Sequence, residues 1–260
     1  MKPLLWLTYY KIVANRMFWL LLVGFLSVYF LALGILSAFS QHAGLGMQLA
    51  SVLHRPYVWG NLCWLGQIGH FMLSLFLIMI VANDYEHGTL RKQVIDGVSR
   101  TGMLAHYSLL CVALSVISLL TVVAAGLIFS TPGFSGAGSW MEWSQAQILG
   151  RFFLQGIAFY GFTLLVILWV KRSMFAVVFL SLWQLGLEPL LGVILNHKVR
   201  EGISDFMPLH SILAVVPTPH VPTLGITMAD SLSLVGITAA VVYTILFFFG
   251  CGVRLAYEDL

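Results

Sequence analysis

Residues 17–39 read MFWLLLVGFLSVYFLALGILSAF, a run of 23 residues without a single charged side chain. A helix rises about 1.5 Å per residue and the hydrocarbon core of a bilayer is about 30 Å thick, so a helix of this length spans a membrane. The apolar core of a cleaved signal peptide has only about 7–15 residues. We therefore expect the run to be retained as a transmembrane helix.

The rest of the chain has the same character. Of the 260 residues, 60% are hydrophobic and 9% are charged, whereas about a quarter of the residues are charged in soluble domains. Further apolar runs lie at about 59–83, 103–129, 148–170, 174–196 and 231–253. The sequence therefore predicts an all-α integral membrane protein, in which residues 1–260 form a single transmembrane domain with six membrane-spanning helices.

The positions of lysine and arginine predict the orientation. Nine of these residues fall on one side of the six runs: Lys2, Lys11, Arg16, Arg91, Lys92, Arg100, Lys171, Arg172 and Arg254. Four fall on the other side: Arg55, Arg151, Lys198 and Arg200. By the positive-inside rule we expect a multi-pass protein of the inner (cytoplasmic) membrane with both termini in the cytoplasm. The net charge of +3 is too small to indicate nucleic acid as a partner.

The segment before the first run is amphipathic. Its residues Leu5, Tyr9, Ile12 and Val13 have the i, i+4, i+7, i+8 spacing of one helix face. The segment also contains basic residues, and its aromatic side chains suit the depth of the lipid headgroups. We expect residues 3–16 to form an interfacial helix lying along the membrane surface.

Residues 83–100, NDYEHGTLRKQVIDGVSR, interrupt the apolar sequence with a concentration of charge. We expect the second span to end near Glu86, because Gly88 can adopt the left-handed conformation that terminates a helix. Thr89 is then the expected N-cap of a short helix over 89–96, which Gly97 ends, and Ser99 is the expected N-cap of the third span. Leu90, Val94 and Val98 have i, i+4, i+8 spacing, so this helix would present an apolar ridge on the membrane surface.

Four polar residues within the spans are possible cavity-lining residues: Gln67, His70, Gln184 and Glu188. We expect His70 to make a hydrogen bond between helices, with a contact to a ligand or substrate as the alternative. Glu188 precedes Pro189, which we expect to kink the fifth span. An ionisable group in hydrocarbon has to face protein or a water-filled cavity, so Glu188 either lines a substrate path or makes a buried structural hydrogen bond.

The sequence contains little that indicates catalysis. Ser135 in GFSG (133–136) has no histidine on the last span to take its proton, so a membrane serine protease is not favoured. No two histidines have the i, i+3 or i, i+4 spacing of helical metal ligands, and Cys63, Cys111 and Cys251 fall in three separate runs. None of the lysines follows a glycine, which excludes a phosphate-binding loop. We expect no catalytic residue, no metal site and no cofactor in this chain.

The segment 83–100 resembles the loop between spans two and three in permease subunits of the type-two exporter class of ATP-binding-cassette (ABC) transporters. The shared pattern is an acidic residue, Gly-Thr, a basic residue, a short apolar helix and Gly-x-Ser-Arg. In this chain it reads Glu86, Gly88-Thr89, Arg91, Val94-Ile95 and Gly97-Val98-Ser99-Arg100. The stretch YYKIVANRMFW (9–19) is similar to the start of such subunits, and six spans with both termini inside also fit.

The resemblance implies a role for each part. Residues 89–96 would be the coupling helix that enters a cleft of a separate cytoplasmic ATPase subunit, which binds ATP and Mg²⁺. The implied ATPase-coupling residues are Glu86, Gly88, Thr89, Leu90, Arg91, Val94 and Arg100. Six spans are half of the usual twelve, so a second copy or a sister permease is implied, within membrane lipid. The implied activity is outward movement of a lipidic, peptide or drug-like molecule, and the alternatives are a non-transporting scaffold or sensor and, third, a membrane-embedded enzyme.

Overall fold

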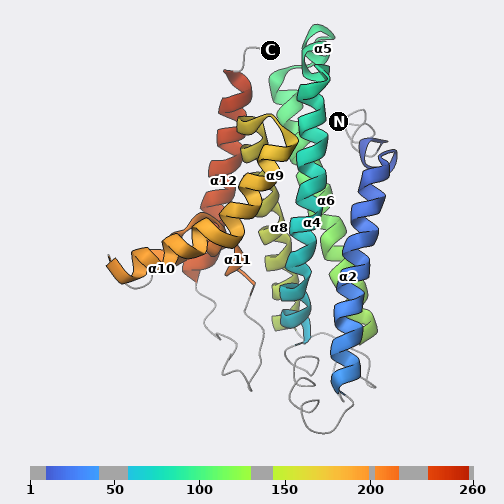
Figure 1. The fold of residues 1–260 in the computed structure, drawn as a ribbon, viewed down its shortest axis with the longest axis vertical. Coiled ribbons are helices and arrows are strands. Elements are labelled where there is room, and N and C mark those ends of the chain that lie inside the picture. The colour runs from blue at the N-terminus through green and yellow to red at the C-terminus, as the bar shows by residue number, and fades with distance from the viewer. Residues whose placement is uncertain (1–9, 41–57, 130–142, 199–202, 217–233, 258–260) are drawn as a thin grey trace.

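The computed structural model describes residues 10–40, 58–129, 143–198, 203–216 and 234–257. These residues form helices and no strand. The long helices, side by side in Figure 1, are α2 (Arg16–Ser40), α4 (Val58–Glu86), α6 (Arg100–Phe129), α8 (Trp143–Val170) and α12 (Leu234–Ala256). The short helix α5 (Thr89–Ile95) lies at the end of the bundle where α2 begins and α12 ends.

Six described segments are long and apolar enough to cross a membrane, as the sequence predicted. They are Arg16–Ala38, Val58–Glu86, Arg100–Phe129, Gln147–Val170, Ser173–Lys198 and Gly236–Ala256. Five of the six agree with the expected bounds to within three residues. The last, Gly236–Ala256, starts five residues and ends three residues later than expected, and residues 231–233 lie outside the described residues. The expected interfacial helix 3–16 lies partly outside the described residues; residues 10–13 are helical, and the helix is interrupted at Asn15 before α2 begins.

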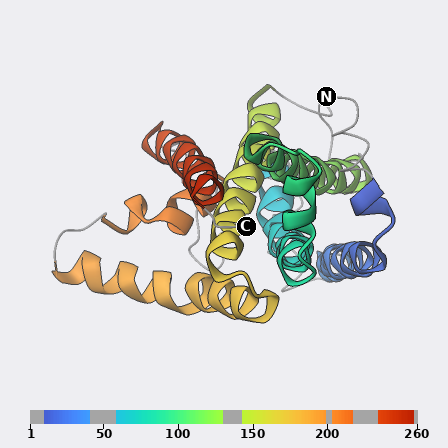
Figure 2. The ribbon, with the colours of Figure 1, turned by 90° about the horizontal axis from the view of Figure 1, so that it is seen from above.

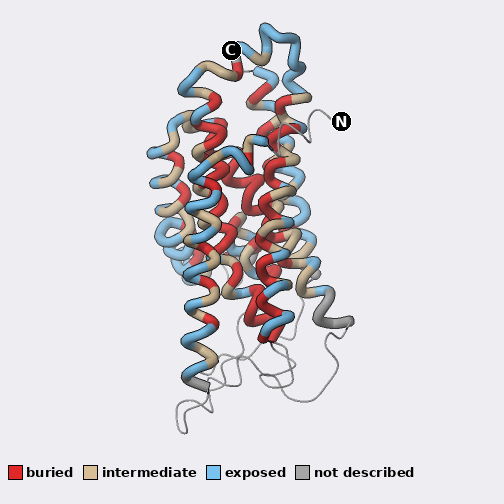
Figure 3. Tube along the Cα trace, turned by 90° about the vertical axis from the view of Figure 1, so that its right-hand side faces the viewer, coloured by how far each residue is buried: buried red, intermediate tan, exposed pale blue. Residues whose placement is uncertain are grey.

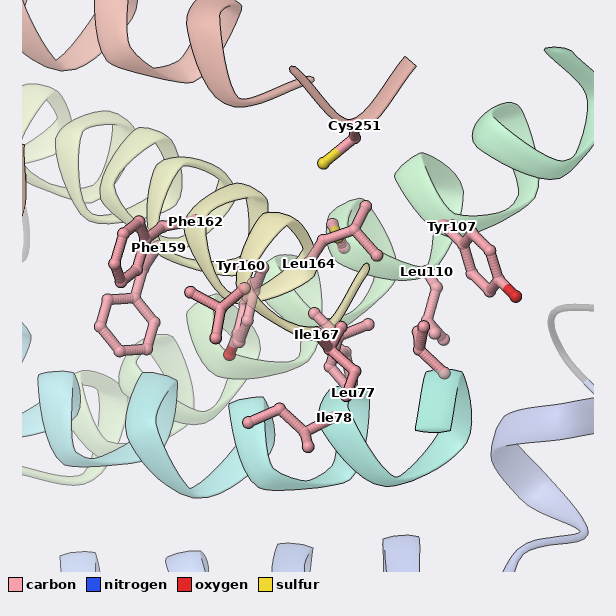
Figure 4. Packing of buried hydrophobic residues seen from close by; sticks show 14 of the residues in the cluster. Leu77, Ile78, Tyr107, Leu110, Phe159, Tyr160, Phe162, Leu164, Ile167 and Cys251 are labelled. Carbon is pink, nitrogen blue, oxygen red and sulfur yellow. The ribbon is translucent and has the colours of Figure 1, made fainter. Parts of the chain in front are cut away.

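The core of the bundle lies between α4, α6 and α8. Figure 4 shows side chains of these helices meeting there, among them Leu77 of α4, Leu110 of α6 and Ile167 of α8, each with 0% of its surface exposed. A cluster of this kind is stabilised by removal of apolar surface and by close packing, both of which depend on the fit of the facing side chains. These three helices therefore form the centre against which α2 and α12 pack.

Close approach between α2 and α4 depends on Gly69. A Cβ atom added there would lie 2.3 Å from Cζ of Phe25, far inside van der Waals contact. The Phe25 ring fills the space that a side chain would need, and it is itself fully buried. Small residues at helix interfaces allow this kind of packing in membrane proteins.

The fifth span is bent. It consists of α9 (Ser173–Leu182), a π-helical turn η1 (Trp183–Leu187) and α10 (Glu188–Lys198), and α10 leaves the bundle to one side (Figures 1 and 2). Pro189 has no N–H to donate within the helix, and the N–H of Glu188 reaches the carbonyl of Trp183, five residues back. The kink expected at Pro189 is thus a π-helical turn that ends two residues before the proline.

The chain returns to the bundle through a 3₁₀ turn, η2 (Ile203–Phe206), and a short helix, α11 (Pro208–Leu213). Pro208 occupies the first turn of α11, where its missing N–H costs no hydrogen bond. The hydroxyl of Tyr243 in α12 donates to the carbonyl of Phe206. This contact ties the segment after α10 to the last span.

Candidate functional site

The short helix α5 is bounded by two glycines in the left-handed conformation. Gly88 has φ of 63° and Gly97 has φ of 85°. A residue with a Cβ atom adopts this conformation at a cost, so glycine is the natural residue at both turns. The expected left-handed turn at Gly88 is confirmed, and α4 ends at Glu86 as expected.

The C-terminal turn of α5 has the hydrogen bonds of a Schellman motif. The N–H of Gly97 donates to the carbonyl of Val94 (3.0 Å), and the N–H of Val98 donates to that of Gln93 (2.9 Å). Ser99 then caps α6, because its Oγ accepts the N–H of Gly102 (3.1 Å). The local sequence therefore predicted the end of α5 to within one residue. The helix ends at Ile95, whereas residue 96 was expected.

The expectation that Thr89 is the N-cap of α5 is wrong. Gly88 occupies that position, without a side-chain hydrogen bond. The hydroxyl of Thr89 turns back toward α4, where its oxygen lies 2.9 Å from the carbonyl oxygen of Asp84 and 3.0 Å from Oδ1 of the same residue. Thr89 therefore holds the start of α5 to the end of the second span.

Asp84 is the centre of a polar cluster that sequence reasoning missed. Nζ of Lys11 lies 2.7 Å from its Oδ2 and 3.0 Å from its Oδ1, and the Tyr107 hydroxyl donates to Oδ2 (3.0 Å). With Thr89, the carboxylate joins the segment before α2, the end of α4, the start of α5 and the first turns of α6. Hydrogen bonds to a charged group contribute about 1.5–3 kcal/mol each, so this cluster links the four segments firmly.

Arg100 joins the start of α6 to the end of α12. Its Nη1 donates to the carbonyl of Leu255 (3.2 Å) and to that of Ala256. The last carbonyls of a helix have no partner within it, and they carry the negative end of the helix dipole. Arg100 therefore satisfies the C-terminal end of the last span.

The two-residue connection between α8 and α9 lies at the same end. Lys171, with φ of 61°, is the one residue other than glycine with positive φ among the described residues. Its Nζ lies 5.5 Å from the centre of the Tyr85 ring at the end of α4, within the range of a cation–π interaction. The segment that contains α5 and the connection between α8 and α9 are therefore both attached to the end of α4.

The apolar ridge expected on α5 is only partly exposed. Leu90 is buried against the bundle (1% exposed), whereas Ile95 is 83% exposed, with Val94 and Val98 beside it in sequence and also exposed. In Figure 3 this end of the molecule is mostly exposed, while buried residues run through the middle of the bundle. Glu86 is exposed and makes no ion pair with any side chain that the structure describes; the side chain of Arg91 lies outside that set.

The expected hydrogen bond of His70 between helices is not present. Its ring stacks on Phe152 of α8 at 4.3 Å between ring centres, and neither ring nitrogen has a hydrogen-bond partner among the described residues. Tyr160 meets the same ring edge-on at 5.7 Å. Gln67, one turn earlier on α4, is half-buried, and its Nε2 is likewise unpaired within the described part of the chain.

Glu188 is buried, with hydrogen bonds to both of its oxygens. The indole of Trp183 donates to Oε2 (2.6 Å), and the backbone N–H of His210 in the first turn of α11 donates to Oε1 (2.6 Å). Of the two readings left open for this residue, the contacts match the structural one, in which the carboxylate caps α11 and closes the π-helical turn. Gln184, the fourth of the possible cavity-lining residues, is half-buried in that turn.

Other features of the sequence stay outside the site. Ser135 lies outside the described residues, and within the described ranges no three histidine, cysteine or acidic side chains come close enough together to hold a metal ion. Comparison of the sequence with protein-family models and with curated proteins gave no match. The function is therefore inferred from the chain's own residues.

Proposed function

We propose that this chain is the transmembrane permease subunit of an ABC exporter and that α5 is its coupling helix. The observation that carries the proposal is α5 itself. It is a short helix of set length between two left-handed glycines, and exposed apolar side chains, Val94, Ile95 and Val98, lie at its C-terminal end and in the turn that follows. An apolar face rimmed by charged residues at the end of a membrane bundle fits docking to a partner.

The contacts of Asp84 support a mechanical role for this end of the molecule. A force applied to α5 acts on Thr89, and through Asp84 on Lys11, on α4 and on Tyr107 in α6. A partner ATPase that moves α5 would therefore move several helices together. Hydrolysis would occur in that partner, which binds ATP and Mg²⁺, and this chain would supply the path for a lipidic, peptide or drug-like molecule.

The proposed assembly has two permeases in the inner membrane with their termini in the cytoplasm. Either a second copy of this chain or a sister permease would complete the twelve spans that the resemblance implies. The orientation rests on the nine lysine and arginine residues assigned to the side that carries α5. Labelling of single cysteines introduced at Asp96 and Asn196, one at each proposed side, tests it in intact cells.

Retention of an ATPase in mild detergent tests the function. We expect the purified full chain to bring down a cassette ATPase encoded beside it, and Ile95→Asp to release that ATPase. Tyr257→Ser is the matched control, because Tyr257 is 82% exposed at the same end but directly follows α12. If no ATPase is retained by the wild-type chain, the non-transporting scaffold or sensor becomes the favoured function.

Coupling is tested separately from binding. Gly88→Pro removes the N–H that donates to the carbonyl of Tyr85 and forbids the positive φ of 63°. We expect this variant, and a double replacement of Glu86 and Arg91, to lose transport-linked ATP hydrolysis even where the ATPase stays bound. Undiminished coupling in both variants would contradict the role assigned to α5.

A further inference from the structure

The bend in the fifth apolar segment shortens its reach through the bundle. The segment starts beside Lys171 and Arg172, which the positive-inside rule places at the membrane surface. From there α9 has 10 residues and η1 has 5, so at about 1.5 Å per residue the two reach about 22 Å, less than the roughly 30 Å of a hydrocarbon core. The next element, α10, runs across the bundle axis (Figures 1 and 2). The segment therefore turns aside before it reaches the opposite surface.

The uncovered face of α10 is apolar. Its exposed side chains before the last turn are Pro189, Leu190, Leu191, Val193 and Ile194. Leu190 is 62% exposed and Val193 is 71% exposed. The opposite side of the helix lies against η2 and α11, its main neighbours in the fold. A helix that lies on a membrane surface turns a polar face to water, and α10 has exposed polar residues only in its last turn, at His197 and Lys198.

The polar side chains on the covered side of α10 have hydrogen bonds within the chain. Glu188 accepts a hydrogen bond at each carboxylate oxygen, one of them from the backbone of α11. Near the other end of α10, the amide of Asn196 donates to the hydroxyl of Ser204 (2.8 Å) and accepts the backbone N–H of Ser204 (3.0 Å). These contacts join α10, η2 and α11 into a helical hairpin that is tied at both ends. Polar groups in hydrocarbon need partners inside the protein, and this hairpin supplies them.

The distribution of small and large residues on α10 indicates what covers its exposed face. Helices that pack on each other in a membrane favour small residues at the contact. The glycine within α10, Gly192, lies on the covered side, where an added Cβ atom would be 3.3 Å from Cβ of Ser204. The exposed face instead consists of proline, leucine, valine and isoleucine side chains. This composition fits fluid acyl chains better than the surface of a second helix.

We propose that the hairpin is embedded in the leaflet opposite α5, with α10 close to the membrane plane and its exposed face in contact with phospholipid acyl chains. The fifth segment then ends within this leaflet instead of crossing it as a straight helix. On the other side of the hairpin, α11 packs on α8 and α12, which fixes its depth. Lys198 at the tip extends its ammonium group to the lipid headgroups, as long side chains near helix ends do. The proposal is independent of the coupling role of α5.

Spin labels on single introduced cysteines test this placement, with the full chain in phosphatidylcholine liposomes. Collisions of each label with oxygen, which concentrates in hydrocarbon, and with a water-soluble nickel chelate give its depth. Leu190→Cys and Ile194→Cys place labels four residues apart on α10. Ile245→Cys and Phe249→Cys are the matched pair on α12, with the same spacing and similarly exposed positions. The wild-type chain gives the background signal, because its three cysteines are buried.

We expect the two labels on α12 to differ in depth by about 6 Å, as four residues of a crossing helix do, and the two labels on α10 to differ by less than half of that. Equal differences on the two helices would show that α10 crosses the membrane and would overturn the proposal. Nickel access at Leu190→Cys as high as at Ile95→Cys on α5 would place α10 in water, with the same consequence. Low access of both reagents, or dipolar broadening between labels of two chains, would show that a second copy covers the face and would contradict the contact with lipid.

Discussion

Lys11 and Asp84 lie 73 positions apart in the sequence, and their side chains form an ion pair of 2.7 Å at the end of the bundle that carries α5. The exposed fractions of the two side chains are 23% and 10%, so water screens the pair only in part. The same carboxylate accepts hydrogen bonds from Thr89 and Tyr107. The pair is therefore the central connection between the segment before the first span and α5.

We predict that Asp84→Asn lowers the stability of the full chain by about 3 kcal/mol, because removal of one partner leaves a partly buried charge unpaired. Unfolding can be followed with a thiol-reactive fluorophore, since the three cysteines are free and buried. Asp96→Asn is the control, because Asp96 is an exposed acid beside α5. Equal melting temperatures for the two variants would show that the cluster does not stabilise the fold.

Arg100→Gln should loosen the end of the last span. The variant loses the donors to the carbonyls of Leu255 and Ala256, so we expect faster amide hydrogen exchange over residues 252–256. Arg16→Gln removes an exposed arginine at the same end and serves as the control. Exchange that rises equally in both variants would assign the effect to net charge and contradict the capping role.

Glu188→Gln should destabilise α11. A glutamine side chain keeps one acceptor oxygen but presents an amide nitrogen to the second donor, so either Trp183 or the His210 N–H loses its partner. The expected loss is about 1–3 kcal/mol, with faster exchange over residues 208–213. Glu86→Gln, a change at an exposed acid, is the control. Unchanged stability in Glu188→Gln would revive the alternative in which Glu188 serves a substrate path.

Gly69→Ala should weaken the packing of α2 on α4. The added methyl group would lie 2.3 Å from the Phe25 ring, and overpacking of this kind costs about 1–3 kcal/mol. Gly34→Ala is the matched control, because nothing lies within 4 Å of its added Cβ, and alanine favours the helix. The prediction fails if the two variants have the same melting temperature.

Local signals in the sequence predicted local structure well. Gly88, Gly97 and Ser99 were assigned from their neighbours alone, because a left-handed turn and a serine cap involve atoms only a few residues apart. The assignment of Thr89 failed because its hydroxyl has a competing acceptor at Asp84, five residues earlier. The spans were predictable because each depends on an uninterrupted apolar run.

Contacts between helices were not predictable in the same way. Glu86 was expected to carry a structural or docking role, whereas the structure places Asp84 in the cluster with Lys11 and Tyr107. Apolar residues are spread around all sides of α4. Its sequence therefore has almost no helical periodicity that would mark the face turned toward the bundle. The approach of His70 and Ser115 to Gly156 was missed for the same reason, since it depends on the relative heights of three helices.

The sequence by itself determined that this chain has six segments long and apolar enough to cross a membrane and that a short helix lies between the second and third of them. Those features follow from run length and from turn residues, whose physics acts over a few neighbouring positions. Only the tertiary structure decided that Lys11 pairs with Asp84, that Arg100 caps α12 and that His70 faces Gly156. Each of these contacts depends on the rotation and height of packed helices, which are set by the fit of side chains far apart in the chain.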